Sequence, residues 1–463
     1  MNDLLDRARQ RAADFLDTVD NRPVFPPAGF HELVGLLDSA LPEDGEAPEA
    51  IIDRLASAAQ QGAVATPGPR YFGFVTGGAL PAAVAAEWLT AAWDQNAGLN
   101  VLSPFSAAVE HVAAKWLLDV LGLPATASVG FVTGATMANV TGLAAARHEV
   151  LRRVGWDVEA NGLQGAPVIT VVAGAEAHAS LRSAARLVGL GAGKIVPVDA
   201  DDQGRMVPAA LRSVLSQVTG PLIVCAQSGN VNTGAFDPLA EIVELAHAKG
   251  GWVHVDGAFG LWAAVSPALE HLVDGVAGAD SWALDGHKWL NVPYDSGFAI
   301  VAHPAAHRAA MSQTAAYLLA AEGAERDGMD WTPEASRRAR ANPVYAALCS
   351  LGRRGLSALV ERCCACARRL ADGVRGEPGI EVLNIVVLNQ VLLRFRSTSG
   401  ENITRDVTAA IQRSGVLWAG GTMTAGEPAL RVSVSGWRTT DADVDRSLAA
   451  ILGAHRSCYN PHA

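Results

Sequence analysis

Hydrophobic and polar positions follow two different periods along this chain. Between Met1 and Val19, apolar side chains recur every three or four positions among charged ones, at Leu4, Leu5, Ala8, Ala12, Phe15, Leu16 and Val19. This spacing predicts an amphipathic helix that packs on another surface. Helical patterning broken by proline-rich turns continues to about residue 65, so we expect a helical N-terminal segment over 1–65.

A different pattern runs from about residue 66 to 342. Short apolar runs bounded by Gly, Pro or Asp alternate with helical stretches, and the clearest runs are 168–172, 222–226, 252–255 and 298–301. Buried strands that alternate with helices are typical of a mostly parallel sheet covered on both faces. We therefore predict a large α/β domain over 66–342.

The pattern changes again near residue 343. A helical run over 343–370 precedes three strand-like runs, at 386–388, 391–395 and 430–434. A final helix is expected over 441–452, with Thr440 as its N-cap. These elements predict a smaller C-terminal α+β domain over 343–463.

Composition narrows the class of protein. The 463 residues exceed what one small core needs, and 36 basic against 47 acidic residues give a net charge of −11, which favours neither nucleic acid nor an anionic membrane as partner. We identify no secretory signal and no charge-free run of the ~20 residues that a membrane helix needs, so we expect a cytoplasmic protein. The cluster Cys363, Cys364 and Cys366 fits no zinc spacing, and we predict free thiols and no metal site.

The first candidate for a chemical role is Lys288, in the segment Asp285-Gly-His287-Lys288-Trp289. A lysine among apolar and small residues is costly unless it is paired or used chemically. Desolvation favours its neutral amine, which is the form that attacks an aldehyde. The alternative is a lysine whose ammonium group reaches water.

A carboxylate ends the predicted strand 252–255. Asp256 is followed by small residues, including Ala258. In an open α/β sheet the ligand crevice lies beyond the carboxyl ends of the strands, where an Asp could pair with a cationic ring nitrogen. The alternative is an Asp that caps a turn.

A third stretch, 130–139, runs from an apolar segment into a helix through small residues. Thr133, Gly134, Ala135 and Thr136 form the start of that helix. Exposed backbone N–H groups and the helix dipole favour an anion at such a position, so a cofactor phosphate could bind there. Alone, the stretch indicates only a helix N-terminus.

Two further candidates follow predicted strands. His178 could lie flat on a cofactor ring, although a single histidine after a strand is usually structural. Asn230 and Asn232 belong to a Gly/Asn turn that could point amides at a ring oxygen, and the alternative is an ordinary turn.

In order and spacing these five elements resemble the group II pyridoxal 5′-phosphate (PLP)-dependent amino acid decarboxylases, which include aromatic-amino-acid and glutamate decarboxylases. The resemblance extends from about Tyr71 to the C-terminus. The segments that carry the resemblance are Arg70–Gly78, Ser103-Pro104, Thr133–Thr136, Ala177-His178, Val255–Ala258 and Asp285–Trp289.

The resemblance implies the roles of the candidate residues. Lys288 would carry PLP as a Schiff base, Asp256 would pair with the pyridine nitrogen, and His178 would stack on the ring. The phosphate would be surrounded by Ala135, Thr136, Asp285 and His287. The family implies the type I aminotransferase-like fold and an obligate homodimer with shared active sites, in which the N-terminal helices clasp the partner.

The sequence departs from this family at one loop. Aromatic decarboxylases of the group carry a tyrosine there that protonates the carbanion, whereas Glu322–Arg340 contains Trp331 and no tyrosine. Indole N–H is a poor acid, so Trp331 cannot simply replace a phenol. Tyr317 and Tyr345 flank the loop and are candidate substitutes.

The preferred hypothesis is therefore decarboxylation of an L-amino acid, with alternatives kept open. These are a decarboxylation-coupled aldehyde synthase, a carbon–carbon lyase, an aminotransferase and, as a minor alternative, a non-catalytic PLP-binding regulator. An aromatic or bulky apolar substrate is slightly preferred, because the expected pocket is aromatic: Tyr71, Phe72, Phe74, Trp93 and Trp331. Arg70 and Arg431 could pair with an anion, although a structural role for either is the alternative.

Overall fold

The computed structural model describes residues 1–38, 40–313 and 326–459. Contacts divide the chain into two compact units. The larger unit consists of Ala79–Ala365 and Asn384–Gln390, and the smaller one of Met1–Gly78, Cys366–Leu383 and Val391–Ala463. The division predicted from sequence, at residues 65 and 342, stays a prediction.

The larger unit is built on a seven-stranded sheet in the order β1-β7-β6-β5-β4-β2-β3. The strands are β1 (Ser128–Val132), β2 (Thr170–Gly174), β3 (Val196–Val198), β4 (Leu222–Gln227), β5 (Trp252–Asp256), β6 (Ser281–Asp285) and β7 (Gly297–Val301). From β6 to β3 all neighbours pair in parallel, whereas β7 is antiparallel to both β1 and β6. The mostly parallel α/β sheet predicted from sequence is confirmed.

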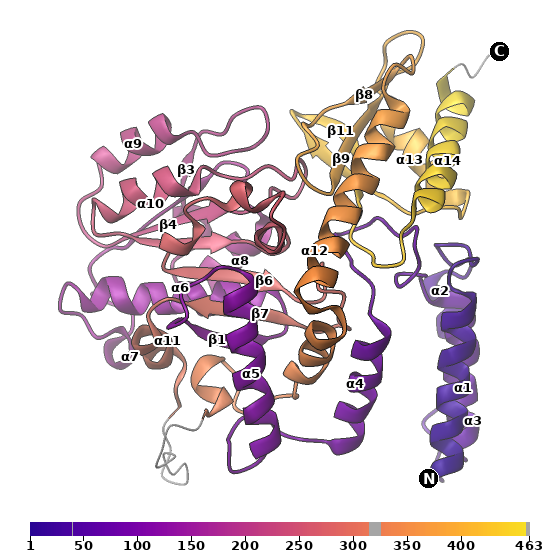
Figure 1. The fold of residues 1–463 in the computed structure, drawn as a ribbon, viewed down its shortest axis with the longest axis horizontal. Coiled ribbons are helices and arrows are strands. Elements are labelled where there is room, and N and C mark those ends of the chain that lie inside the picture. Colours follow the sequence, from indigo (N-terminus) through magenta and orange to yellow (C-terminus); the bar gives the residue numbers. More distant parts are fainter. Residues whose placement is uncertain (39, 314–325, 460–463) are drawn as a thin grey trace. The chain divides into compact units, whose positions relative to one another are not determined.

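Helices cover this sheet on both faces (Figure 1). The α-helices are α4 (Pro81–Trp93), α5 (Pro104–Val120), α6 (Ala135–Arg152), α7 (Val158–Asn161), α8 (Ala179–Leu187), α9 (Pro208–Ser216), α10 (Leu239–His247) and α11 (Pro304–Met311). Short 3-10 helices span Ala192–Lys194, Gly260–Val265, Glu270–Val273, Val276–Gly278 and Gly328–Trp331. The long helix α12 (Ala341–Val374) begins in this unit and has a non-helical residue at Gly352.

The strands of the larger sheet show almost no alternation of apolar and polar residues, because both of its faces are buried. All residues of β1, β4, β5, β6 and β7 are buried. Helices α6, α8 and α11 share one apolar cluster with Ile223, Cys225 and Trp252 of the sheet. Because both faces are covered, the strands are continuous apolar runs, and the polar residues that end them are placed at the sheet's edge.

The smaller unit contains a four-stranded sheet in the order β10-β11-β9-β8. Its strands are β8 (Ile380–Val382), β9 (Gln390–Phe395), β10 (Gly420–Thr424) and β11 (Glu427–Ser433). Its helices are α1 (Asn2–Thr18), α2 (Phe30–Leu37), α3 (Pro48–Gly62), α13 (Thr404–Arg413) and α14 (Asp441–Tyr459). Both terminal helices were predicted, and Thr440 caps α14 by accepting the Asp443 N–H at 3.4 Å.

One predicted strand is wrong. Residues 386–388 form no strand, because the segment around them is held by side chains rather than by a strand ladder. Asn384 Nδ2 donates to the carbonyls of Thr233 and Gln390 at 2.8 and 2.9 Å, and Ile385 N donates to Gln203 Oε1 at 2.9 Å. Among the described helices, none combines the length and the apolar character required to cross a bilayer.

Candidate active site

Lys288 lies in the turn between β6 and β7. The two residues after it, Trp289 and Leu290, are fully buried and anchor the turn. The Lys288 side chain is 18% exposed, and its Nζ lies 3.0 Å from Asp285 Oδ2. Nζ also lies 5.8 Å from the ring centroid of Phe259. The amine is therefore sheltered and has one carboxylate partner.

Asp285 joins this turn to the start of α6. Its Oδ1 accepts the backbone N–H of Ala135 at 2.5 Å and lies 3.4 Å from His287 Nε2. A Cβ on Gly134 would lie 2.9 Å from His287 Cε1 and 3.2 Å from Asp285 Oδ1, so only glycine leaves this space open. Burial lowers the pKa of His287.

This open cradle fits a phosphate group. The first turn of a helix has unpaired N–H groups, and the Thr136 side chain is exposed beside them. Asp285 offers no donor when ionised, so its part here is to hold Ala135 and Lys288 rather than to bind an anion. Thr133, directly before Gly134, is half-buried at the end of β1.

Asp256 ends β5 and is buried. Its Oδ2 accepts from Asn139 Nδ2 at 3.1 Å and from Ser180 Oγ at 3.4 Å, and its Oδ1 accepts the Ala258 N–H at 3.2 Å. Among the described residues it has no ion-pair partner, and all of these donors are neutral. A buried carboxylate held only by neutral donors fits a cationic ring nitrogen.

His178 is exposed at the N-terminus of α8. Its Nδ1 lies 2.7 Å from Ser180 Oγ, and Ser180 connects it to Asp256. Sequence reasoning missed Ser180 and Asn139 as members of this site. Asn139 carries a usable signal, because it stands four positions after Ala135 and so lies on the same side of α6.

The two asparagines lie in a tight turn after β4. Asn230 is buried, and its Oδ1 accepts the N–H groups of Asn232 and Thr233 at 2.9 and 3.2 Å. The side-chain oxygen of Asn230 is thus used inside its own turn. A contact of Asn230 or Asn232 with a cofactor stays a prediction.

Three of the predicted pocket residues belong to the smaller unit. Tyr71 and Phe74 both stack on Trp418, with ring centroids 5.2 and 5.3 Å away. Phe74 is exposed, whereas Phe72 is buried in the core of this unit. A Cβ on Gly73 would lie 2.0 Å from Trp418 Cζ3, so glycine is needed for this stacking. Sequence reasoning missed Trp418.

The other two pocket residues belong to the larger unit. Trp93 is partly exposed and packs edge-on against Phe105 at 5.2 Å. Trp331 packs edge-on against His307 at 5.3 Å and lies under the Arg326 guanidinium at 5.5 Å. These contacts place Trp331 beside α11.

Only one of the two candidate tyrosines, Tyr345, lies among the described residues. Tyr317 lies outside the described residues. Tyr345 stacks on Trp116 at 5.0 Å, and its pKa is raised, first by a hydrogen bond with Cys349. A raised pKa makes the phenol a weaker acid.

The two arginines considered as anion partners both lie in the smaller unit. Arg70 is buried, pairs with Asp443 at 2.9 Å and donates to the carbonyls of Asp20 and Val416 at 2.7 and 2.8 Å. Arg70 is therefore structural. Burial lowers the pKa of Arg431.

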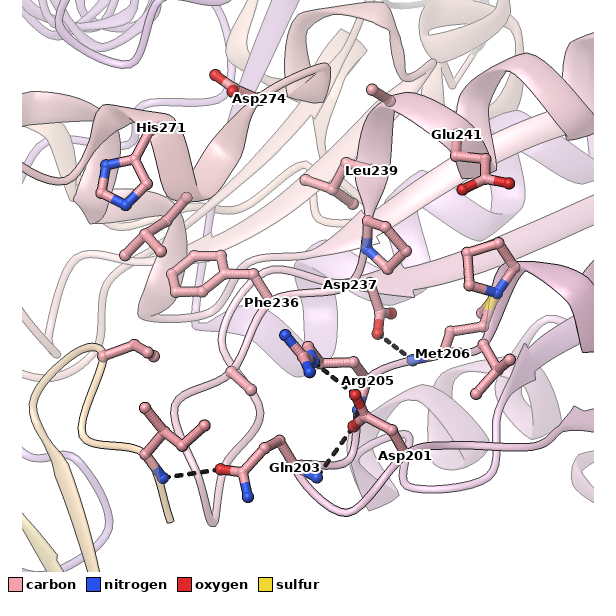
Figure 2. A pocket seen from close by; sticks show the side chains of 18 residues that line it. Asp201, Gln203, Arg205, Met206, Phe236, Asp237, Leu239, Glu241, His271 and Asp274 are labelled. Atoms are coloured by element: carbon pink, nitrogen blue, oxygen red, sulfur yellow. Dashed lines mark hydrogen bonds and ion pairs between the residues drawn. The ribbon is translucent and has the colours of Figure 1, made fainter.

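A hollow of about 640 Å³ lies elsewhere in the larger unit (Figure 2). Its wall includes Asp237, whose two oxygens accept the N–H groups of Met206 and Gln227, each at 2.7 Å. Burial raises the pKa of Asp237 to about 6. None of the site residues predicted from sequence lines this hollow.

Comparison with known proteins identifies the family. The model of the pyridoxal-dependent decarboxylase conserved domain matches residues 31–396. L-2,4-diaminobutyrate decarboxylase of Rhizobium meliloti (strain 1021) is 29% identical over 453 residues, which are 95% of this chain and 89% of the relative. Phenylacetaldehyde synthase of Arabidopsis thaliana is 24% identical over 452 residues, 93% of this chain and 91% of the relative.

Solved structures agree on the fold. The crystal structure of Oryza sativa TDC with PLP and tryptamine superposes with a TM-score of 0.92 at 23% identity, over 99% of this chain and 98% of that one. The predicted type I aminotransferase-like fold class is thereby confirmed. The chain belongs to the pyridoxal-dependent decarboxylase family, and it is an enzyme of the carboxy-lyase class whose cofactor is pyridoxal 5′-phosphate.

Proposed function

We propose that this enzyme decarboxylates an L-amino acid, with Lys288 as the residue that bonds the cofactor. The observation that carries the proposal is Asp256, a buried carboxylate that receives hydrogen bonds only from neutral groups among the described residues. Such a carboxylate suits a protonated pyridine nitrogen, which makes the cofactor ring an electron sink. Lys288 and the open start of α6 belong to the same unit.

The residues around Lys288 would share the work of binding and orientation. Asp285 holds Nζ at 3.0 Å, which keeps the amine pointed at one place. We propose that the phosphate is bound by the first-turn N–H groups of α6, the Thr136 hydroxyl and His287. The exposed imidazole of His178 would stack on the ring and hold a proton beside the reacting carbon.

A second candidate function is oxidative decarboxylation to an aldehyde. It is favoured by the loop after Lys288, where Trp331 and no tyrosine stands in Glu322–Arg340, and by the similarity to phenylacetaldehyde synthase. Carbon–carbon cleavage, transamination and a regulatory role stay as alternatives that the same assay separates.

Substrate, assembly and compartment are also proposals. We propose an aromatic or bulky apolar substrate, which the similarity to phenylacetaldehyde synthase supports. A homodimer is supported by large apolar side chains exposed around α4 and α5: Trp88, Leu89, Trp93, Val101, Leu102 and Phe105. We propose the cytoplasm as compartment, in line with six free cysteines.

The test is an assay of the PLP-loaded enzyme on single L-amino acids, including phenylalanine, tryptophan, 2,4-diaminobutyrate and cysteine sulfinate. Carbon dioxide, amine, aldehyde, hydrogen peroxide and keto acid are measured for each. Amine and carbon dioxide without peroxide support simple decarboxylation, aldehyde with peroxide supports the second candidate, and keto acid without carbon dioxide contradicts both.

Lys288→Ala tests the site itself. This variant should lose the visible absorbance of the lysine-bound cofactor and all turnover, because no other amine takes its place. Lys249→Ala, at an exposed lysine, is the matched control and should retain both. Retention of the absorbance band in Lys288→Ala would refute the assignment.

A further inference from the structure

One face of β5 carries a row of polar side chains that ends at Asp256. Trp252, His254 and Asp256 are two positions apart, so their side chains leave the strand on the same side. Helix α6 packs against that side and contributes Asn139 and Gly142. The row therefore lies between the sheet and a helix, away from solvent.

Hydrogen bonds join this row into one chain. Trp252 Nε1 donates to Ser281 Oγ at 2.8 Å, and Ser281 Oγ lies 2.8 Å from His254 Nδ1. His254 Nε2 lies 2.8 Å from Asn139 Oδ1, and Asn139 Nδ2 donates to Asp256 Oδ2 at 3.1 Å.

The direction of every bond in this chain is fixed by its ends. An indole N–H only donates, and an amide oxygen only accepts. Since Asn139 Oδ1 accepts, His254 Nε2 carries the proton, and its bare Nδ1 accepts from the Ser281 hydroxyl. Burial lowers the pKa of His254 to about 4, which keeps the ring neutral. All four donors thus point toward the Asp256 carboxylate.

The residues around this chain of hydrogen bonds are closely packed and leave space for the His254 imidazole. Asn139, His254, Ser281 and Trp252 are each 0% exposed, so an unmade bond at any of them would be costly. Gly142 sits in the middle of α6, where glycine disfavours a helix by about 1 kcal/mol relative to alanine. A Cβ there would lie 2.6 Å from His254 Cε1 and 2.8 Å from its Nδ1. The helix thus gives up stability to make room for this ring.

We propose that Asn139, His254, Ser281 and Trp252 are positioning residues that fix the Asp256 carboxylate and stabilise its negative charge, so that it keeps the cofactor's ring nitrogen protonated. Aligned hydrogen bonds in a dry interior strengthen one another, and their sum acts on the last acceptor. No buried cation is needed, which leaves the carboxylate's charge for the ring. The inference rests on the proposed function, in which Asp256 faces that nitrogen.

The test uses the full chain loaded with PLP labelled with ¹⁵N in the ring. The ¹⁵N chemical shift reports whether the ring nitrogen is protonated, and an absorbance titration gives the dissociation constant of PLP. His254→Leu should move the shift toward neutral pyridine and weaken PLP binding by about 2- to 10-fold, the size of one neutral hydrogen bond. His254→Gln retains a donor and an acceptor and should restore most of both signals.

Matched variants separate positioning from mere folding. His307→Gln alters another fully buried neutral histidine of the same unit, outside the chain, and should leave the shift unchanged. If His254→Leu does not fold, Trp252→Phe and Gly142→Ala carry the test, because the first removes the donor that begins the chain and the second crowds the His254 ring within it. An unmoved shift in these variants overturns the proposal.

Asp256→Asn tells the two proposals apart. If this variant leaves the ¹⁵N shift unchanged, Asp256 does not face the ring nitrogen and the proposed function of that residue fails. If Asp256→Asn moves the shift but His254→Leu does not, only the positioning chain is wrong.

Discussion

Two of the buried carboxylates of the larger unit, those of Glu110 and Asp256, are held in opposite ways. Glu110 on α5 lies between two arginines, with Arg326 Nε 3.2 Å from Oε2 and Arg337 Nη2 2.8 Å from Oε1. Asp256 at the end of β5 is held by neutral donors alone among the described residues. A charge with a built-in counter-ion serves the fold, whereas a charge without one is available for a ligand.

The arginines of the first site confirm its structural character. Arg337 donates to the carbonyls of Ala97 and Phe131 at 2.7 and 2.9 Å, and Arg326 donates to that of Val129. The triad of Glu110, Arg326 and Arg337 thereby ties β1 to the part of the chain around residues 326–337. The charged groups of all three side chains are engaged with partners inside the protein, so we assign them a structural role and no role in substrate binding.

The largest expected effect comes from breaking the triad. Glu110→Gln leaves two buried guanidinium groups without their counter-ion and should lower the free energy of unfolding by about 3–5 kcal/mol. Asp256→Asn should cost much less stability, because its partners are neutral, yet it should weaken PLP binding strongly. Urea denaturation of the PLP-free proteins and PLP titration measure the two quantities.

Asp119→Asn is the control for this comparison, because Asp119 pairs with Arg353 on the surface and its loss should change neither quantity measurably. Equal destabilisation by Glu110→Gln and Asp256→Asn would erase the proposed difference between the two sites.

An intermediate effect is expected from acid. His307 is buried between Ser128 and the Trp331 carbonyl, and burial lowers its pKa from the ordinary 6.5 to about 3. The unfolded chain binds a proton there below about pH 6.5 and the folded chain does not, so stability falls as pH falls. Between about pH 7 and 4.5 the loss from this group should be about 2.5 kcal/mol.

His307→Gln should flatten this pH dependence of the urea midpoint. His31→Gln, at an exposed histidine, should leave the slope as it is. A slope that is identical in all three proteins would mean that other groups account for the acid sensitivity.

The comparison also explains what the sequence could predict. Lys288, Asp256 and the start of α6 stand at strand ends and at a helix start, where local pattern and topology determine position. Asn139 has a local signal in its spacing of four from Ala135, whereas Ser180 and Trp418 could not be found in this way, because each contributes through a partner that is distant in sequence. His254 was readable in principle, since a polar residue two positions before Asp256 on a fully buried strand needs a partner. Residues 386–388 were misjudged because side-chain hydrogen bonds replaced the strand ladder that their apolar pattern predicted.

The smallest effect is expected at Trp331, beside the triad. Its Nε1 is buried and has no hydrogen-bond partner within 1–38, 40–313 and 326–459. Trp331→Phe therefore removes an unsatisfied donor and should change the free energy of unfolding by no more than about 1 kcal/mol. Trp282→Phe is the matched control: Trp282 Nε1 donates to the Val276 carbonyl at 3.0 Å, so its loss leaves an acceptor unpaired and should cost more.

Because indole N–H is a poor acid, Trp331→Phe should also leave the ratio of amine to aldehyde unchanged. A shift of that ratio would mean that Trp331 takes part in the reaction. The surroundings of Glu110 would then serve catalysis as well as the fold, and the contrast between Glu110 and Asp256 would no longer separate structural from catalytic residues.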